Sequence, residues 1–526
     1  MTTQRLGTLS GSAALVLLAV STSACNSVIG LNDLKVDDSP IAPGAECETN
    51  SECTSKLSAT AGAETLGVCV KPEGKCVALL SDDCDTITGD PRQEGVIVLG
   101  SLFSTKGAQA ATNLNRQQSA MLAVNEINSL GGIPSPSGGA RQLVMVSCNE
   151  SDGAWKRAGV HLVDELKVPA IVGPNTSQDT IDVSTQISVP GGTVMMTPSA
   201  VASEIGDLSD NDLTWLMVPS DVQRAPLMIR QINELERQIK AERGVDTVKL
   251  SVITRGDALG IGTRTSLNSL RLNERPLSEQ IGTDKTVLVD TYEPTIKEPP
   301  QALIAKHVTF GPDIVVLAGT AEAISFVMKP LEETWTASGH RPLYVTIDST
   351  KVPELLTLVT GNDELRRRVR GTGIVPGTES ASVYETFKQA YLSEYPGSTA
   401  TISGMGPSYD AAYSIAYAIA AAGDEPITGA IVSQNLRKLA GGATTIEVGR
   451  QDVTRAFQQL IEGERIRAIG TFGALDWNEN GTVVGGTLEM WCISAPGGGT
   501  PAYRSSMLYF DLASSTESGS YVQCAP

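Results

Sequence analysis

The stretch from Val96 to Pro198 alternates short apolar runs with helical patterns, and this alternation constrains the fold more than any other feature of the chain. The apolar runs have the length and composition of buried strands, whereas Ala120, Val124 and Ile127 recur at the spacing of a helix. Strands separated by helices form βαβ units and hence a parallel sheet. The predicted strands are Val96–Ser101, Gln142–Ser147, Ala170–Gly173 and Thr193–Thr197.

The same alternation returns further along the chain, without a sequence repeat between the two halves. It predicts a second parallel sheet, and therefore an α/β protein with two lobes. Small ligands bind beyond the carboxyl ends of parallel strands, and a cleft between two lobes is the first place to expect a ligand. The predicted strands of the second lobe are Lys249–Thr254, Val287–Thr291, Asp313–Gly319 and Leu343–Asp348.

Five longer motifs occur in a fixed order within residues 93–490. They are NEINSLGGI (Asn125–Ile133), AIVGPNTS (Ala170–Ser177), VPGGTVMMTPSA (Val189–Ala200), PDIVVLAG (Pro312–Gly319) and SYDAAYSIAYAIAAAG (Ser408–Gly423). As an ordered set they resemble the leucine/branched-chain amino-acid-binding family of periplasmic receptors, which has the type I substrate-binding fold. The resemblance implies two parallel-sheet lobes with three crossovers between them, near residues 216–221, 371–375 and 470–475.

Two further segments are expected before the first lobe. The expected division is a signal peptide at 1–24, a lipid tether and Cys-rich module at 25–91, lobe 1 at 92–216 and 376–469, and lobe 2 at 217–375 and 470–526.

The first 25 residues have the features of a bacterial lipoprotein signal. Ala13–Val20 is apolar but too short to span a bilayer, which needs roughly 20 residues. Small residues precede Cys25, so Cys25 is predicted to carry the lipid. The mature protein would then be anchored to the bacterial cell envelope, periplasmic or facing the outer membrane. The alternative is an ordinary secretory signal in which Cys25 has no role.

The remaining cysteines predict disulfides, as expected for an exported protein. Cys84 lies just before the first predicted strand and Cys148 just after the second, so we expect the intervening segment to run back along the sheet and the two to pair. We also expect a pair that ties the C-terminal tail to a strand, Cys492 with Cys524. A zinc site is the weaker alternative, because no Cys-x-x-Cys occurs and the first histidine is His161. The other four are predicted to pair among themselves, with three possible connectivities: Cys47, Cys53, Cys69 and Cys76.

The composition and the motifs argue against nucleic-acid binding, catalysis, dinucleotide binding and calcium binding. A formal net charge of −19 argues against nucleic acid, which requires a basic face. The sequence contains neither a Gly-x-Ser-x-Gly nor a Walker loop, so no enzyme, metal or cofactor is expected. Gly260-x-Gly262-x-x-Thr265 lacks the third glycine of a dinucleotide fingerprint. Asp476-x-Asn478-x-Asn480-Gly481 begins like a calcium loop, but Thr487 stands where the loop needs a glutamate, so a turn between strands is favoured.

The best candidate ligand residues follow predicted strands. Thr176 and Ser177 open a helix after the third strand, where a hydroxyl either caps the helix or binds an anion together with free N–H groups. The resemblance implies that Ser177 meets a ligand carboxylate. Asp348, from the second lobe, is expected to be the only charge facing the cleft, where it would meet an ammonium or hydroxyl group. The other expected lining residues are Ser104, Thr105, Ser199, Ala200 and, at the border of the cleft, Tyr409.

The sequence therefore predicts a receptor that closes on a small polar ligand, amino-acid-like or an amide, and delivers it to an ABC importer. The alternative is a surface sensor or interaction protein without a transporter, which the Cys-rich extension favours.

Overall fold

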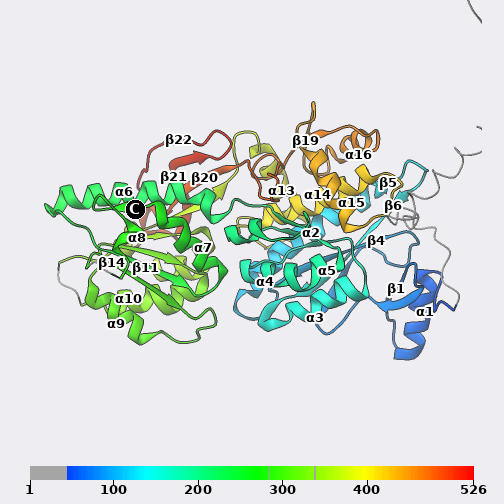
Figure 1. The fold of residues 1–526 in the computed structure, drawn as a ribbon, viewed down its shortest axis with the longest axis horizontal. Coiled ribbons are helices and arrows are strands. Elements are labelled where there is room, and N and C mark those ends of the chain that lie inside the picture. The colour runs from blue at the N-terminus through cyan, green and yellow to red at the C-terminus, as the bar shows by residue number, and fades with distance from the viewer. Residues whose placement is uncertain (1–43, 283–284, 337–338, 526) are drawn as a thin grey trace, which may run out of the picture.

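The computed structural model describes residues 44–282, 285–336 and 339–525, which form two α/β lobes and a small N-terminal module (Figure 1). The predicted lipidation site Cys25 and the signal peptide lie outside these residues. No helix in the described ranges is long and apolar enough to cross a membrane.

Lobe 1 is built on a six-stranded sheet in the order β10-β9-β8-β4-β7-β3. All its strand pairs are parallel except that of β3 with β7. The four strands predicted for this lobe are confirmed. The strands are β3 (Cys84–Thr88), β4 (Ile97–Phe103), β7 (Leu143–Asn149), β8 (Ala170–Val172), β9 (Val194–Thr197) and β10 (Thr214–Leu216).

Helices cover both faces of the lobe 1 sheet. One face of the sheet packs against α2 (Ala110–Ser129) and α14 (Met405–Ala422), and these two helices also pack on each other. The opposite face packs against α3 (Trp155–Val160) and the residues that follow it. The remaining helices and strands of this lobe are α4 (Ser177–Val183), α5 (Val189–Gly191), α13 (Ala381–Glu394), α15 (Gly429–Leu436), α16 (Val453–Ile461), β5 (Ile133–Pro134), β6 (Ala140–Arg141), β18 (Thr444–Glu447) and β19 (Ile466–Ile469).

Lobe 2 is built on an eight-stranded sheet in the order β14-β11-β15-β16-β17-β20-β21-β22. The pairs from β14 to β17 are parallel, and those from β17 to β22 are antiparallel. The four strands predicted for this lobe are again confirmed. The strands are β11 (Leu250–Arg255), β14 (Val287–Tyr292), β15 (Ile314–Ala318), β16 (Leu343–Thr346), β17 (Val369–Val375), β20 (Thr487–Ser494), β21 (Ala502–Asp511) and β22 (Thr516–Gly519).

The helices of lobe 2 also lie on both faces of its sheet. One face packs against α6 (Asp221–Arg243) and α7 (Ala258–Ser266), and the other against α9 (Gln301–Phe310), α10 (Lys329–Glu333) and α11 (Pro353–Val359). The chain passes between the lobes after β10, after β17 and after β19. The second crossing follows β17, a few residues later than the predicted 371–375, because those residues still pair with β20.

The N-terminal module consists of α1 (Asn50–Ala61) and the hairpin β1 (Gly67–Val70) with β2 (Lys75–Ala78). It lies at the end of lobe 1 away from lobe 2 (Figure 1). Apolar side chains of the hairpin pack against lobe 1 residues such as Leu162, so packing holds the module as well as crosslinks. The expected boundary at residue 91 is corrected by β3, which belongs to the sheet of lobe 1 because it pairs with β7.

Two of the predicted disulfides are confirmed, Cys84–Cys148 and Cys492–Cys524. Among the four module cysteines only Cys47 and Cys69 are bonded. The prediction is wrong for Cys53 and Cys76, which are free; the thiol of Cys53 donates a hydrogen bond to the carbonyl of Val68 at 3.2 Å instead. The sulfurs of Cys47, Cys53 and Cys76 lie within 4.8 Å of one another. With Cys47 crosslinked, however, two thiols remain where structural zinc takes four ligands.

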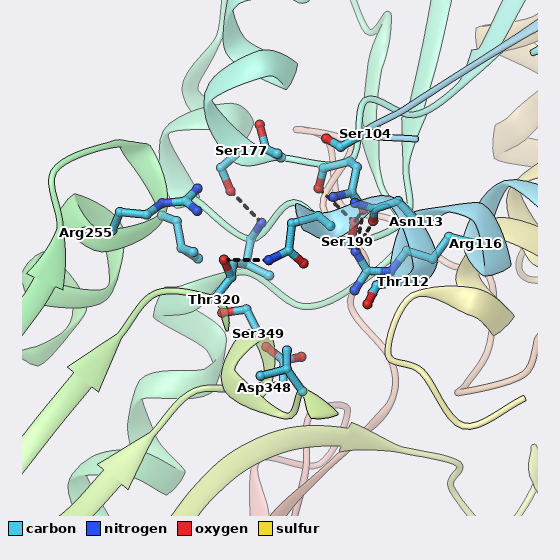
Figure 2. Close-up of a pocket in the computed structure, with 16 residues that line it drawn as sticks. Ser104, Thr112, Asn113, Arg116, Ser177, Ser199, Arg255, Thr320, Asp348 and Ser349 are labelled. Atoms are coloured by element: carbon cyan, nitrogen blue, oxygen red, sulfur yellow. Dashed lines mark hydrogen bonds between the residues drawn. The ribbon is translucent and has the colours of Figure 1, made fainter. Parts of the chain in front are cut away.

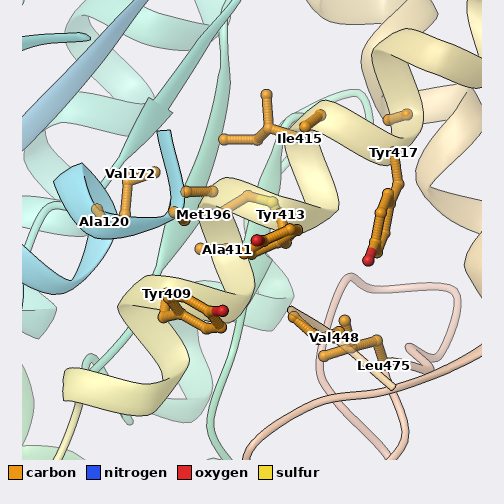
Figure 3. Packing of buried hydrophobic residues seen from close by; sticks show 14 of the residues in the cluster. Ala120, Val172, Met196, Tyr409, Ala411, Tyr413, Ile415, Tyr417, Val448 and Leu475 are labelled. Atoms are coloured by element: carbon orange, nitrogen blue, oxygen red, sulfur yellow. The ribbon is translucent and has the colours of Figure 1, made fainter. Parts of the chain in front are cut away.

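Tyr409 is not at the cleft, contrary to the prediction. Helix α14 is buried along nearly its whole length, and Tyr409 lies in the lobe 1 core beside Tyr413 (Figure 3). The hydroxyls of both tyrosines donate to the same carboxylate oxygen of Glu126, at 2.6 and 2.7 Å. Burial raises the pKa of Glu126, and the two hydrogen bonds oppose that shift. Tyr409 is therefore a core residue that joins α14 to α2.

Asp410, the next residue, links α14 to the third crossing. Its Oδ2 accepts hydrogen bonds from the N–H and the hydroxyl of Thr471, at 2.8 and 2.7 Å. Its Oδ1 is buried and makes no hydrogen bond in the described part of the chain. Burial raises the pKa of Asp410 to about 7, although the bonds from Thr471 lower it.

Asp410→Asn should remove a pH dependence of stability. The folded state holds a proton on Asp410 up to about pH 7, whereas the unfolded chain releases it near pH 4. Between these values the folded state binds more protons, so the free energy of unfolding falls as pH rises, by at most about 1.4 kcal/mol per pH unit. Urea unfolding at pH 5 and pH 7 should show a smaller decrease in Asp410→Asn than in the wild type. An equal decrease would contradict this assignment.

Candidate functional site

A cavity of about 100 Å³ lies between the two lobes (Figure 2). Hydroxyl and charged side chains line it on both sides, and amide side chains line it from lobe 1. Lobe 1 contributes Ser104, Gln109, Thr112, Asn113, Arg116, Asn175, Thr176, Ser177, Ser199 and Val201, and lobe 2 contributes Arg255, Leu259, Thr320, Asp348, Ser349 and Val352.

The strands explain why these residues converge. Ser104 directly follows β4, and Ser199 comes two residues after β9. On the other side Thr320 comes soon after β15, and Asp348 soon after β16. The carboxyl ends of parallel strands share one edge of a sheet, so the loops that follow them meet there. The two sheets present these edges to each other, and the predicted place for a ligand is the place where the cavity lies.

Thr176 and Ser177 divide the two roles that the sequence allowed. Thr176 is the N-cap of α4, and its Oγ1 accepts the backbone N–H of Asp179 at 3.1 Å. Ser177 lines the cavity, and its Oγ accepts the N–H groups of Val201 and Ala202 at 3.1 and 3.2 Å. An oxygen that accepts two hydrogen bonds still has its own proton to donate. Ser177 can therefore give that proton to an acceptor in the cavity.

Five of the eight predicted ligand residues line the cavity: Ser104, Thr176, Ser177, Ser199 and Asp348. Besides Tyr409, the cavity lining does not include Thr105 or Ala200. The N–H of Thr105 is directed to the carbonyl of Phe103 and to Asn149, at 2.8 and 3.1 Å. Ala200 is buried, and its N–H donates to Thr197 Oγ1 at 3.2 Å. Both backbone donors are thus used inside lobe 1, where the loops turn away from the cavity.

Asp348 has a partner that the sequence did not reveal. Its Oδ2 lies 2.5 Å from Nη1 of Arg224, which comes from the first turn of α6. Both side chains are about nine-tenths buried or more. The Nε of Arg224 also donates to the carbonyl of Pro219 at 2.8 Å, which fixes the guanidinium. The prediction that Asp348 is the only charge facing the cavity is wrong, because Arg116 and Arg255 line it too.

Arg255 is neutralised within lobe 2. Its Nη2 lies 2.5 Å from Asp257, and its Nη1 lies 3.5 Å from Glu322. These carboxylates raise the pKa of Arg255 against the effect of its burial. Thr320 is held by the same network, because its N–H donates to Glu322 at 3.0 Å.

The polar residues at the start of α2, including its N-cap Gln109, are one part of the site that was missed. Gln109, Thr112, Asn113 and Arg116 follow one another at intervals of three, one and three residues, which places them on one face of the helix. This polar stripe was visible in the sequence, beside the apolar stripe that identified the helix. Nε2 of Gln109 donates to Oγ1 of Thr320 at 3.4 Å, a hydrogen bond between the two lobes (Figure 2).

No protein-family model and no curated protein sequence matches the chain. Solved structures do resemble it. The branched-chain amino acid transporter substrate-binding protein LivJ from Streptococcus pneumoniae, in complex with isoleucine, has a TM-score of 0.56 at 18% identity, over 78% of this chain and 99% of its own.

Two further structures are similar to the same extent. The leucine-binding protein LivK from Thermotoga maritima has a TM-score of 0.55 at 15% identity, over 78% of this chain and 98% of its own. A periplasmic binding protein of type 1 from Bordetella pertussis has a TM-score of 0.54 at 14% identity, over 78% of this chain and 100% of its own. The chain thus has the two-lobed type I periplasmic-binding-protein fold, with an N-terminal module added to it.

Proposed function

We propose that the protein is an extracytoplasmic receptor, not an enzyme, that closes its lobes on a small polar ligand. The observation that carries the proposal is the cavity between the lobes, with hydroxyl and amide groups from lobe 1 facing charged and hydroxyl groups from lobe 2. Closure would be a hinge motion about the three crossings, and the ligand would stabilise the closed state through its higher affinity for that state.

Delivery of the ligand to an ABC importer is the second part of the proposal. It is supported by the likeness to substrate-binding proteins of amino acid transporters. A lipid on Cys25 would keep the receptor at the membrane. The boundaries between the two lobes would lie near residues 216, 375 and 470. The N-terminal module favours a second function, sensing without transport, because it adds a surface at the far end of lobe 1 (Figure 1). Uptake of the bound ligand should fall in cells that lack the protein if it serves an importer, and stay unchanged if it is a sensor.

The ligand can be sought by thermal shift of the mature protein with amino acids, amides and small carboxylates. For a ligand found in this way, Ser177→Ala should weaken binding by roughly ten- to a hundredfold, since losing a hydrogen bond to a charged group costs about 1.5–3 kcal/mol. Calorimetry on the wild type and the variant measures this. The variant should also melt earlier, because the N–H groups of Val201 and Ala202 lose their acceptor.

Ser184→Ala is the matched control. Ser184 follows α4, is buried, and bonds Thr214 at 2.8 Å, but it does not line the cavity. It should lower stability without changing affinity. Equal affinity of Ser177→Ala and the wild type would place the ligand elsewhere.

A further inference from the structure

Three acidic side chains at the cavity are already paired with arginines. Asp348 is the only one that lines it, and it forms an ion pair with Arg224. Asp257 and Glu322 pair with Arg255. A ligand ammonium entering this cavity would lose its water and find, among the described lining residues, only a carboxylate that already has a cationic partner. Such desolvation is unfavourable unless a new ion pair replaces the water.

Arg116 is the opposite case. Its Nε donates to the carbonyl of Ser403 at 2.7 Å, and its Nη1 donates to Asn113 and Asn175 at 2.8 and 2.6 Å. These acceptors are neutral, and in the described part of the chain no carboxylate is in ion-pair contact with Arg116. Its Nη2 has no hydrogen-bond partner there. Burial lowers the pKa of Arg116 to about 10, so the side chain remains cationic at neutral pH.

A second buried acid, Glu150, lies beside the cavity without lining it. Glu150 is 1% exposed, and it accepts hydrogen bonds from the hydroxyl of Ser104 and the N–H of Asn175. Burial, together with the charge of Asp179, raises the pKa of Glu150 well above its usual value. Glu150 makes no ion pair with Arg116 in the described part of the chain, so Arg116 lines the cavity from lobe 1 with neutral hydrogen-bond acceptors only.

Three apolar side chains complete the cavity: Val201, Leu259 and Val352. They suit a compact hydrocarbon part of a ligand. Beside them, the hydroxyl proton of Ser177 and the free Nη2 of Arg116 are both donors, and donors of this kind bind a carboxylate with charge assistance.

From this arrangement we infer that the ligand is a small monocarboxylic acid without an ammonium group, bound through its carboxylate to Arg116. The inference rests on the proposed function, because it names the ligand class of the same cavity. It departs from the expectation of an amino acid or amide, since Asp348 already has a cationic partner.

A series of ligands on one carbon skeleton tests the inference in the wild-type protein. The series is 4-methylpentanoate, 4-methyl-2-oxopentanoate, leucine and 4-methylpentanamide, with acetate, propanoate and benzoate to vary the size. We expect one or more of the acids to raise the melting temperature and to bind at least tenfold more tightly than leucine or the amide, about the effect of one charge-assisted hydrogen bond. Leucine or the amide binding as tightly as the best acid would overturn the inference and leave the proposed function standing.

Other failures are also distinguishable. If no acid binds but another neutral or zwitterionic molecule from the wider thermal-shift screen does, the inference is wrong and the receptor function stands. If nothing in either set binds, both are contradicted.

Variants of Arg116 give a second measurement. Arg116→Gln should reduce the affinity for the best acid by about tenfold or more while changing that for the amide little, because only the acid uses the charge. A merely structural role would weaken both alike and would contradict the inference. Arg116→Lys should keep part of the preference for acids, and it serves if the Gln variant does not fold. Arg157→Gln is the charge-matched control, since Arg157 is exposed and lies outside the cavity.

Discussion

Arg224→Met should lower the free energy of unfolding by about 3–5 kcal/mol, the usual cost of removing one partner of a buried ion pair. Asp348 would be left with its charge in a site where 10% of its side chain is exposed. Its remaining side-chain hydrogen bond, from the hydroxyl of Ser403, is 3.5 Å long. The substitution replaces the guanidinium with an apolar group of similar length, so the main loss is electrostatic. Urea unfolding followed by circular dichroism measures the change.

A control on the same helix separates burial from charge. Arg230 also lies on α6 and pairs with Glu234 and Glu517, but these partners are 40% and 42% exposed. Arg230→Met should therefore cost only about 0–1 kcal/mol. In the double variant Arg224→Met/Asp348→Leu, most of the loss should be recovered, because no charge is then left unpaired. Equal effects of Arg224→Met and Arg230→Met would show that the buried pair does not stabilise the junction of α6 with the cavity.

Removing the Cys84–Cys148 disulfide, as the double alanine variant, should destabilise the protein by about 4 kcal/mol. The two cysteines are 64 residues apart, and the chain-entropy model predicts this magnitude for a loop of that length. The crosslink joins β3 to the end of β7, next to the loop that carries Glu150. Thermal and urea unfolding of the variant, compared with the wild type, measure the loss.

Cys53→Ala is the control for the disulfide. Cys53 is buried but free, so its replacement removes a sulfur atom without removing a crosslink. Cys53→Ala should lower the free energy of unfolding by about 1–2 kcal/mol, as other small losses of buried volume do. If the two variants are equally destabilised, the crosslink adds nothing beyond the packing of its atoms.

The strands and their parallel arrangement could be predicted because the information is local. Each predicted strand, such as Gln142–Ser147, is a short apolar run next to a helical pattern, and βαβ units give a parallel sheet. The pairing of Cys84 with Cys148 also followed from position, since both lie at strand ends of one sheet. Ser177 could be placed at the cavity because residues after parallel strands meet at one edge.

Other features depended on contacts that no local pattern encodes. Tyr409 was expected at the border of the cleft, but α14 begins at Met405 and Glu126 of α2 holds the tyrosine in the core. Within the N-terminal module, the spacing of the cysteines left three connectivities open. In the structure the segment before α1 lies against the hairpin, with the N–H of Cys47 donating to the carbonyl of Gly74 at 3.0 Å, and Cys47 is bonded to Cys69.

The sequence by itself determined the two sheets, the cavity edge and most of the hydroxyl groups there, because these follow from periodicity and from residues next to strand ends. Only the tertiary structure decided the charge of the cavity. That charge depends on which ions pair across the fold: Arg224 reaches Asp348 from a distant helix, whereas Arg116 meets only neutral acceptors. Ion pairing is set by distances of a few ångströms between segments far apart in the chain, and such distances exist only after the lobes have packed.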